Sequence, residues 1–461
     1  RRGDLLILGG DEVYPTPSRA AYEQRLVMPF HAAMGWTEAD HPSLFAIPGN
    51  HDWYDNLAAF SRLFTEKTWF CGWRLGQRRS YFALRLPHDW WIIGTDTQLG
   101  ADIDATQVAY FSGIAAQMGP AAKVILCTAE PHWVFEHEAD ADARARMRRD
   151  SNLVFLEETI FKGRVRLNLS GDYHHYRRHS SPDDRDHKIT AGSGGAFLHP
   201  THPFKQTPLP TGHSLRCSFP DVATSRRLAW QNLLFVHRSP TFGALTGLLY
   251  LLVGWNILGA RKDFQIGGLG STAEEFLVTA LSSPSAFTLV IVVLAGFCVF
   301  TDTHKTWYRF AGGLSHAFAH LGAAVAIGWL MGQVAIAAGW SFGGLPHLGA
   351  TLLALFLGGW LIGAQVMGLY LLISLNLFGR HATEAYSGLA IKDYKLFLRL
   401  AVDRAGVLTI YPIGLDRVPR RWQEIQGAPR DQPRFVPAPR DAADPRTRPR
   451  LVEPPIVVPP D

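Results

Sequence analysis

Aspartate, asparagine and histidine recur in this chain directly after short apolar runs, and these residue types can bind and activate cations. Aspartate supplies a hard anionic oxygen that can bridge two cations, asparagine a neutral carbonyl oxygen, and histidine a nitrogen that suits Mn, Fe, Zn or Ni. Two such cations close together can clamp a phosphoryl group and lower the pKa of a shared water. The motifs are Gly10-Asp11, Gly49-Asn50-His51-Asp52 and Gly171-Asp172-Tyr173-His174.

The apolar runs before these motifs, 5–8, 44–47 and 165–169, are short and bounded by glycine, which is typical of buried strands. Helical patterns follow the strands, and Ser18 and Asp104 are placed to cap two of the helices while Asp150 can start a third. This alternation predicts an α/β fold. Because loops at the strand ends of such a sheet face the ligand site, we expect the polar motifs to meet in one cavity.

The order and spelling of the motifs resemble the calcineurin-like metallophosphoesterases, whose blocks run D-x-H, G-D, G-N-H-D or G-N-H-E, a lone His, and G-H-x-H. The resemblance covers residues 1–202 and implies an α-β-β-α sandwich that holds two divalent metal ions. It also implies the role of each matching residue. Asp11 would be the bridging carboxylate, Asn50, Asp172 and His174 further metal ligands, His51 the general acid beside the leaving oxygen, and Asp52 the group that orients the ring of His51.

The chain departs from the family pattern at three blocks. No D-x-H precedes Asp11, and because the chain begins at Arg1 we expect a trimmed N-terminus that lacks a first strand and two ligands. Asp302-Thr303-His304 spells that motif, but it borders a membrane segment and is discounted. Ala129 stands where the family has its lone metal-binding histidine, so Glu130 or His132 could take that place. Asp172 replaces a histidine and would shift the preference toward harder ions.

A second group of histidines lies near the last motif. His175 and His179 are expected in the pocket wall or at the surface rather than among the ligands. His199 and His202 lie in a glycine-rich stretch that could bring them to the site, although a structural role is favoured.

A long apolar region follows the α/β part. Residues 310–379 contain no Asp, Glu, Lys or Arg, which is enough for two membrane spans hinged at 341–347. With 242–260 and 284–301, this predicts an all-α transmembrane domain of four helices. Lys and Arg gather before the first span, between the second and third, and after the fourth, which predicts a multi-pass protein of a bacterial inner membrane with its catalytic domain in the cytoplasm.

His316 and His320 lie four residues apart on one face of the third span. Ionisable groups inside a bilayer are candidates for function, so they could bind a metal, relay protons or bind a phosphate headgroup. Hydrogen bonding between helices is the favoured alternative.

The charge and the cysteines indicate which partners and cross-links to expect. The net charge of +5 is modest, and its basic residues near the spans and in the tail suggest anionic lipid headgroups rather than nucleic acid. The four cysteines show no paired spacing, so neither a disulfide framework nor a zinc knuckle is supported.

The patterns divide the chain into five parts. They are a catalytic domain at 1–202, a linker with a possible interfacial helix at 203–241, the transmembrane domain at 242–379, a small soluble segment at 380–416 with a helix at 382–401 and a strand at 407–413, and a disordered Pro/Arg-rich tail at 417–461.

Together the patterns predict a membrane-anchored phosphoesterase that hydrolyses a phosphomonoester or phosphodiester through a hydroxide activated by two metals. Placement at a membrane favours a lipid or polyprenyl phosphoester as substrate. The competing interpretation is a catalytically degenerate sensor or scaffold, motivated by Ala129, Asp172 and the absent first block. A transporter gated by the soluble domain rests only on the membrane histidines.

Overall fold

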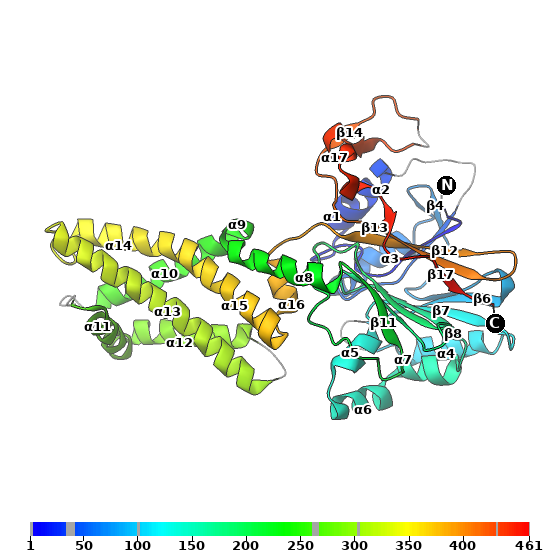
Figure 1. Cartoon of the computed structure of the whole chain (residues 1–461), viewed down its shortest axis with the longest axis horizontal. Helices are drawn as coiled ribbons and strands as arrows, with labels where there is room; N and C mark the ends of the chain where they lie inside the picture. Colours follow the sequence, from blue (N-terminus) through cyan, green and yellow to red (C-terminus); the bar gives the residue numbers. More distant parts are fainter. Residues whose placement is uncertain are drawn as a thin grey trace. The chain divides into compact units, whose positions relative to one another are not determined.

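The computed structural model describes residues 3–33, 42–98, 102–260, 267–301, 305–429 and 432–460 (Figure 1). The chain forms two compact units, of which the first joins Arg1–Val222 to Ile391–Asp461 and the second is Ala223–Ala390. The first unit is mixed α/β and the second is helical. The chain therefore leaves the first unit once, builds the second, and returns to complete the first.

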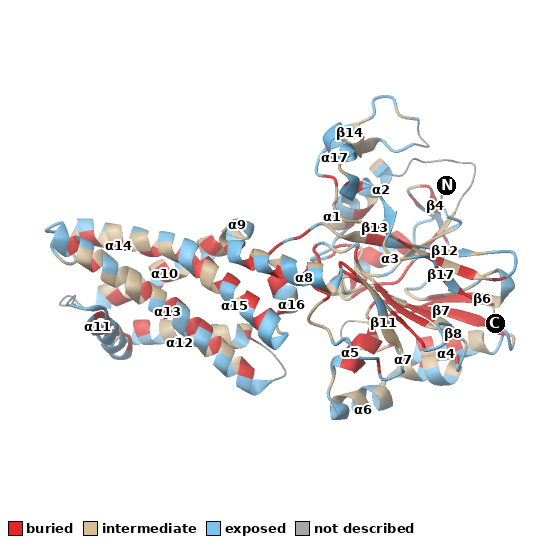
Figure 2. Cartoon of the chain, viewed as in Figure 1, coloured by how far each residue is buried: buried red, intermediate tan, exposed pale blue. Residues whose placement is uncertain are grey.

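A seven-stranded sheet forms the centre of the first unit, in the order β11-β9-β10-β8-β7-β6-β5. Its inner strands β6, β7, β8 and β10 run parallel to one another. Strands β6 and β7 are buried on both faces, as expected for parallel strands that are covered from both sides (Figure 2). The bounds are β5 Phe82–Arg85, β6 Trp90–Gly94, β7 Lys123–Thr128, β8 Val165–Ser170, β9 Tyr176–Ser180, β10 His187–Ala191 and β11 Ser214–Phe219.

Two four-stranded sheets accompany it. One has the order β1-β2-β4-β3, and β1 pairs in parallel with β2. The other comes after the second unit and pairs β12 with β13 over their full length, with β16 and β17 also against β13. The bounds are β1 Leu5–Leu8, β2 Ser43–Ala46, β3 Trp69–Phe70, β4 Trp73–Leu75, β12 Lys395–Val402, β13 Leu408–Leu415, β16 Arg450–Leu451 and β17 Ile456–Val458.

The hydrophobic core shows the order of the layers. Ile92 and Ile125, on one face of the large sheet, share a cluster with Ile47 beside β2 and with Ile410 of β13. The opposite face is covered by helices that include α4 (Ala105–Ala115) and α7 (Asn152–Phe155). The outer face of the β1-β2 sheet packs against α1 (Arg19–Tyr22), the π-helical turn Glu23–Val27 and α3 (Ala58–Phe64). The mixed α/β class predicted from the sequence is confirmed.

The ends of the helices follow their capping residues. The Ser18 hydroxyl accepts a hydrogen bond from the Ala21 backbone N at 3.1 Å, and the Asp104 carboxylate accepts one from Gln107 N at 2.8 Å, which confirms both predicted caps. At the third predicted start the cap is Ser151 rather than Asp150, because α6 (Ala141–Asp150) extends through Asp150.

The C-terminal part differs from the sequence prediction. Only Ala382–Ser387 (α16) is helical within 382–401, and the following stretch is strand β12. The strand expected at 407–413 is confirmed as β13. The tail expected to be disordered contains β14 (Trp422–Glu424), β15 (Phe435–Pro437), α17 (Pro439–Ala443), β16 and β17. Its short apolar segments are ordered because Ile456 and Val458 enter the core of the first unit. Strand β11 likewise falls inside the predicted linker and extends the large sheet.

The second unit consists of helices. In the described part of this unit, three helices are long and apolar enough to cross a membrane, namely Pro240–Ala260 (α10), Thr306–Ala337 (α13) and Leu345–Phe378 (α14 to α15). Leu269–Ser282 (α11) and Pro284–Phe300 (α12) meet at an angle of 104° and count as a fourth span if the pair is taken as one. Helices able to span a membrane are therefore confirmed, and they number three or four where four were predicted. Helices α8 (Val222–Ala229) and α9 (Phe235–Arg238) precede them, in the region of the predicted interfacial helix.

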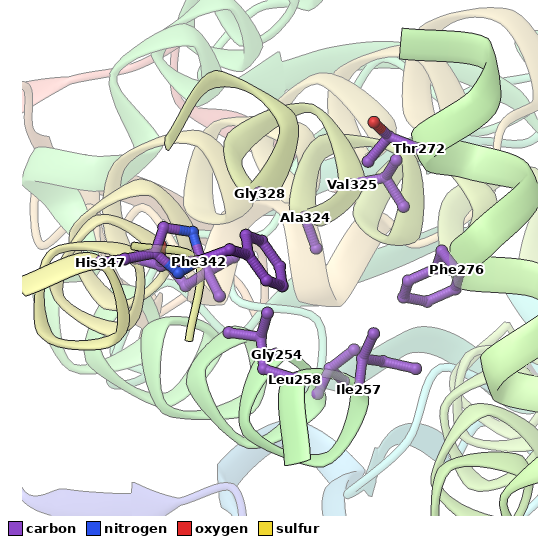
Figure 3. Close-up of a pocket in the computed structure, with 13 residues that line it drawn as sticks. Gly254, Ile257, Leu258, Thr272, Phe276, Ala324, Val325, Gly328, Phe342 and His347 are labelled. Atoms are coloured by element: carbon purple, nitrogen blue, oxygen red, sulfur yellow. The ribbon is translucent and has the colours of Figure 1, made fainter. Parts of the chain in front are cut away.

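A small apolar cavity lies among α10, α11, α13 and α14 (Figure 3). Its volume is about 50 Å³, and Ile257, Phe276, Ala324 and His347 contribute to its lining. A space of this size holds only a few water molecules, which is too small for an organic substrate.

Candidate functional site

Four loops of the first unit meet where β1, β2, β7 and β8 end. Gly10 lies so close to two of them that a Cβ there would come within 3.0 Å of the Gly49 backbone N and 3.3 Å of the Ala129 Cβ. Gly171 N donates a hydrogen bond to the Ala129 carbonyl at 3.0 Å. The loops of the polar motifs therefore do come together, as expected, but they follow strands of two different sheets, with β1 and β2 in one and β7 and β8 in the other.

Asp11 is joined to the loop that carries Asn50. Its carboxylate Oδ1 accepts a hydrogen bond from His51 N at 2.9 Å, and its own backbone N donates to Asp52 Oδ2 at 2.9 Å. Asp11 adopts a φ of +54°, in the left-handed region that few residues other than glycine visit. Asn50, between Gly49 and His51, is thereby held next to Asp11.

The structure differs from the expectation for Asp52. Its fully buried carboxylate accepts from the backbone N of Asp11 and of Gly49, each at 2.9 Å, and from the hydroxyl of Tyr22. The ring of His51 is oriented instead by the Pro15 carbonyl, 2.6 Å from His51 Nδ1. A carboxylate beside several backbone N–H groups binds those donors, because an unpaired buried N–H is costly.

The carboxylates of Asp11, Glu130 and Asp172 are near enough for charge to act between them. Burial, together with the negative charges of Glu130 and Asp11, raises the pKa of Asp172 to about 7. Burial also raises the pKa of Glu130, again with a contribution from Asp11. The pKa of Asp11 is raised by burial and by the Asp52 charge, against the hydrogen bond from His51 N, which lowers it. The mutual repulsion of these groups makes the site attractive to cations.

His174 is held as a neutral ring. Its Nδ1 lies 2.8 Å from the Phe197 carbonyl, and its ring stacks on His199 at 4.2 Å between centroids. Burial and the positive charge of Lys395 lower its pKa to about 4. With the Nδ1 hydrogen donated to a carbonyl, Nε2 carries the lone pair, which is the usual arrangement of a metal-binding histidine.

At the fourth block, Glu130 and His132 differ in their contacts. Ala129 is buried against Gly10 and offers no ligand atom. The Nε2 of His132 is hydrogen-bonded to Glu157 at 3.0 Å, so this ring is already engaged. Glu130 is near enough to Asp11 for the Asp11 charge to raise its pKa, so it remains the candidate for this block.

The other histidines near the last motif are interior. His175 and His179 are each 1% exposed, so a surface position is excluded for both. His199 lies at the site through its stacking on His174, and its Nδ1 accepts a hydrogen bond from His174 N at 3.2 Å. Its role is to support the position of His174.

Two residues at the site carry no sequence signal. Tyr22 donates to Asp52 from α1, and Lys395 of β12 donates to the Gly195 carbonyl, whose backbone lies against the ring of His174. Burial lowers the pKa of Lys395 to about 8. Lys395 is separated from His174 by the whole second unit, so spacing along the chain could not relate the two.

The expected ligand side chains, all among the described residues, are not arranged around a common metal position in this structure. Over the described ranges, no group of three or more His, Cys, Asp or Glu side chains is placed closely enough to hold a metal ion. Asp302-Thr303-His304 lies outside the described residues.

The membrane histidines form contacts between helices. The Tyr250 hydroxyl of α10 lies 3.0 Å from His320 Nδ1, and His320 Nε2 lies 3.2 Å from His316 Nε2. Tyr370 of α15 stacks on His316 at 4.1 Å between ring centroids. These contacts confirm the favoured alternative, hydrogen bonding between helices.

Comparison of the chain with protein-family models, with curated proteins and with solved structures gives no match. The functional argument therefore rests on the site itself.

Proposed function

We propose that this protein is a membrane-anchored, metal-dependent phosphoesterase of the calcineurin-like kind, with Asp11, Asn50, Asp172 and His174 as metal ligands. The observation that carries the proposal is the meeting of Asp11, Glu130 and Asp172 just after three different strands, where the charge of Asp11 raises the pKa of Glu130 and of Asp172. A fold gains no stability from three partly buried carboxylates that repel one another, so their proximity favours a cation site.

The residues fit two divalent ions in charge and in donor type. Three carboxylates supply hard oxygens and a neutral imidazole supplies a nitrogen, a combination suited to Mn, Fe, Zn or Ni. Bound ions would polarise the phosphoryl oxygens and lower the pKa of a water in the site. Glu130, next to Ala129, would replace the family's histidine as a ligand and make the set more acidic.

The chain's own groups supply the remaining steps. His51 is held by Pro15 through Nδ1, so its Nε2 is the atom available to pass a proton to the departing oxygen. Tyr14 and Tyr54 pack edge-on against the ring, at 4.5 and 4.9 Å between centroids, and limit its rotation. Asp52 holds the Asp11 and Gly49 backbones and thereby the relative position of the two loops.

The attached membrane unit favours an amphiphilic phosphoester, such as a phospholipid or a polyprenyl phosphate, as substrate. A site held near a bilayer meets lipid headgroups at high local concentration. Comparing hydrolysis of lipid and water-soluble phosphoesters in detergent tests this preference, and equal rates would remove it.

Substitution of one ligand and one proton donor tests the function. In the full chain with added Mn²⁺, we expect Asp11→Asn to lower both the bound metal and the hydrolysis of a generic phosphodiester. We expect His51→Gln to keep the metal and to lower kcat roughly 10²- to 10⁴-fold. Asp142→Asn, an exposed change on α6, is the control and should alter neither.

The competing proposal is a metal-free sensor or scaffold, favoured by Ala129 and by the open ligand set among the described residues. Metal analysis together with the activity assay separates the two. A metal-replete chain that binds no ions and cleaves no phosphodiester would support the scaffold and contradict the enzyme.

A further inference from the structure

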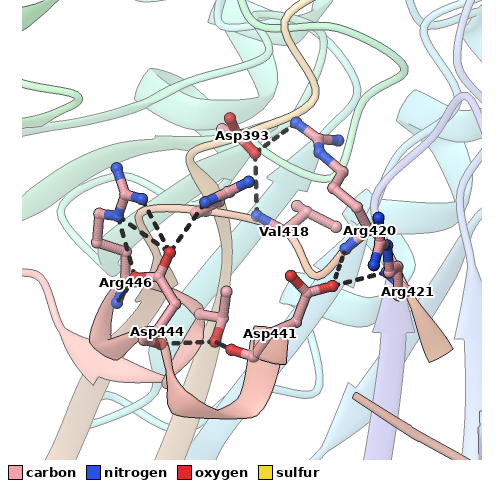
Figure 4. Close-up of polar contacts among 9 residues, drawn as sticks. Asp393, Val418, Arg420, Arg421, Asp441, Asp444 and Arg446 are labelled. Atoms are coloured by element: carbon pink, nitrogen blue, oxygen red, sulfur yellow. Dashed lines mark hydrogen bonds and ion pairs between the residues drawn. The ribbon is translucent and has the colours of Figure 1, made fainter. Parts of the chain in front are cut away.

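A second cavity lies in the first unit, and this one is polar. It is formed by residues within 417–444, far along the chain from Asp11 and His174. These residues belong to the segment after β13 and to α17 with the turn that follows (Figure 4). Its volume is about 310 Å³, at the lower end of small-molecule sites. Every residue that lines it is charged, namely Arg417, Arg420, Arg421, Arg440, Asp441 and Asp444.

The two aspartates of the lining are already occupied. Asp444 accepts from Arg417 Nη1 at 3.0 Å and from Arg446 Nη2 at 2.8 Å. Asp441 Oδ2 accepts from the backbone N of Arg420 at 2.9 Å and of Arg421 at 2.7 Å. These bonds tie the backbone at 420–421 to α17 and hold the arginines around the cavity.

The arginines are not all neutralised. The lining has four guanidinium groups against two carboxylates, which leaves a net charge of +2. Arg420 pairs with Asp393 outside the lining at 2.8 Å. The guanidinium groups of Arg421 and Arg440 have no hydrogen-bond or ion-pair acceptor within the part of the chain that the structure describes.

We propose that this cavity binds a phosphate-bearing anion. The guanidinium fork matches phosphate oxygens in two-point hydrogen bonds, and a phosphomonoester dianion balances the surplus charge of +2. The volume leaves room for a polar group attached to the phosphate, and the absence of apolar residues from the lining excludes a lipid tail. The ligand is therefore a phosphomonoester, either a soluble compound or the headgroup of a lipid.

The test measures binding of inorganic phosphate to the full chain by calorimetry, with divalent metals chelated. Chelation removes phosphate binding at the candidate metal centre, so this test and the test of the phosphoesterase proposal fail independently. We expect the double variant Arg421→Gln, Arg440→Gln to bind phosphate about 100-fold more weakly, at roughly tenfold for each lost guanidinium. Both side chains lack structural bonds among the described residues, so the variant should keep its melting temperature.

Arg448→Gln is the matched control, since Arg448 is exposed in the same segment and does not line the cavity. It should leave phosphate affinity unchanged. Wild-type protein that binds no phosphate, or a double variant that binds as tightly as wild type, would overturn the proposal.

Two lipid compositions identify the source of the phosphate. Phosphate affinity is compared in nanodiscs of phosphatidylcholine mixed with either phosphatidic acid or phosphatidylglycerol, which both add negative charge while only the first exposes a phosphomonoester. Weaker phosphate binding with phosphatidic acid supports a lipid headgroup as ligand. Equal affinities support a soluble phosphomonoester.

Discussion

At the residue scale, buried polar groups are satisfied by partners far away in the chain. Asp52 is next to His51 in sequence, yet it binds the backbone of Asp11 and Gly49 and the hydroxyl of Tyr22. Glu157 is a second example, with Lys188 Nζ at 2.7 Å and His132 Nε2 at 3.0 Å. Such a buried pair is fragile, because removal of one partner leaves the other charge uncompensated.

Glu157→Gln should destabilise the first unit by about 3–5 kcal/mol at neutral pH, because it leaves Lys188 buried without its partner. Burial alone would raise the pKa of Glu157, but Lys188 and His132 outweigh it and the pKa is lowered below its ordinary 4.5. Its stabilising effect is therefore present above about pH 4.5 and declines as the pH falls further. Unfolding of both proteins at several pH values measures the difference.

Glu158→Gln is the control at the neighbouring position, where the carboxylate is half exposed and pairs with Arg148 at the surface. Its cost should stay within about 1 kcal/mol. Equal losses in the two variants, or a Glu157→Gln loss that does not shrink in acid, would contradict the assignment.

At the scale of elements, packing overrides local preference in both units. The alternation of Leu396, Leu398 and Leu400 with polar or exposed positions was a strand signal in a segment expected to be helical. Pairing with β13 over eight residues decided in favour of the strand. In the second unit, small residues allow α10 to approach the π-helical turn Gly359–Gly363 closely, since a Cβ at Gly359 would lie 2.8 Å from the Gly247 Cα.

Gly247→Leu should therefore lower the free energy of unfolding of the second unit by roughly 1–3 kcal/mol or more. The new Cβ would lie 2.6 Å from the Phe356 carbonyl oxygen, and a backbone atom cannot move aside as a side chain can. Gly259→Leu in the same helix is the control, as no atom lies within 4 Å of its Cβ position. Thermal unfolding in detergent should show a lower melting temperature for the first variant only. A similar loss in both would point to helix propensity rather than close packing.

At the scale of the whole molecule, the return of the chain limits how often it crosses the membrane. Residues on both sides of the second unit build one core, and the Trp90 indole donates to the Gly406 carbonyl at 2.9 Å. Both ends of the membrane segment must then lie on the same side, which requires an even number of crossings. Among the described residues, three helices qualify by length and composition, so we expect α12, with 17 residues, to be the fourth span. Helix α11, with Glu274 and Glu275, then lies at the interface.

Cysteine labelling tests this arrangement. In a chain whose four native cysteines are replaced by serine, Ser341→Cys should react with a membrane-impermeant maleimide on intact cells, and Lys162→Cys only after permeabilisation. The reason is the positive charge of Lys305, Arg309 and Arg380, which favours the cytoplasmic side for the ends that carry them. The reverse pattern would contradict the expected orientation. Labelling of both positions from outside would contradict their placement on opposite sides of the membrane.

The sequence by itself determined what depends on neighbours in the chain. It predicted the strands that precede the polar motifs, the caps at Ser18 and Asp104, and the membrane helices. These features follow from periodicity, capping and apolar length, which act over a few residues or one helix. The sequence also placed Asp11, Glu130 and Asp172 just after strands, where ligand loops lie, but it did not show that Asp11 follows a strand of a different sheet from the other two.

Tertiary structure alone decided which partners those residues meet. Asp52 accepts hydrogen bonds from two backbone N–H groups and a tyrosine, and Lys395 lies near His174 although the second unit separates them in sequence. The tail is ordered because Ile456 and Val458 pack in the core. Tertiary structure also gathered the arginines into a cavity. Each of these contacts joins segments whose separation in sequence carries no information on distance, because burial and hydrogen bonding are satisfied wherever the packed layers bring a partner.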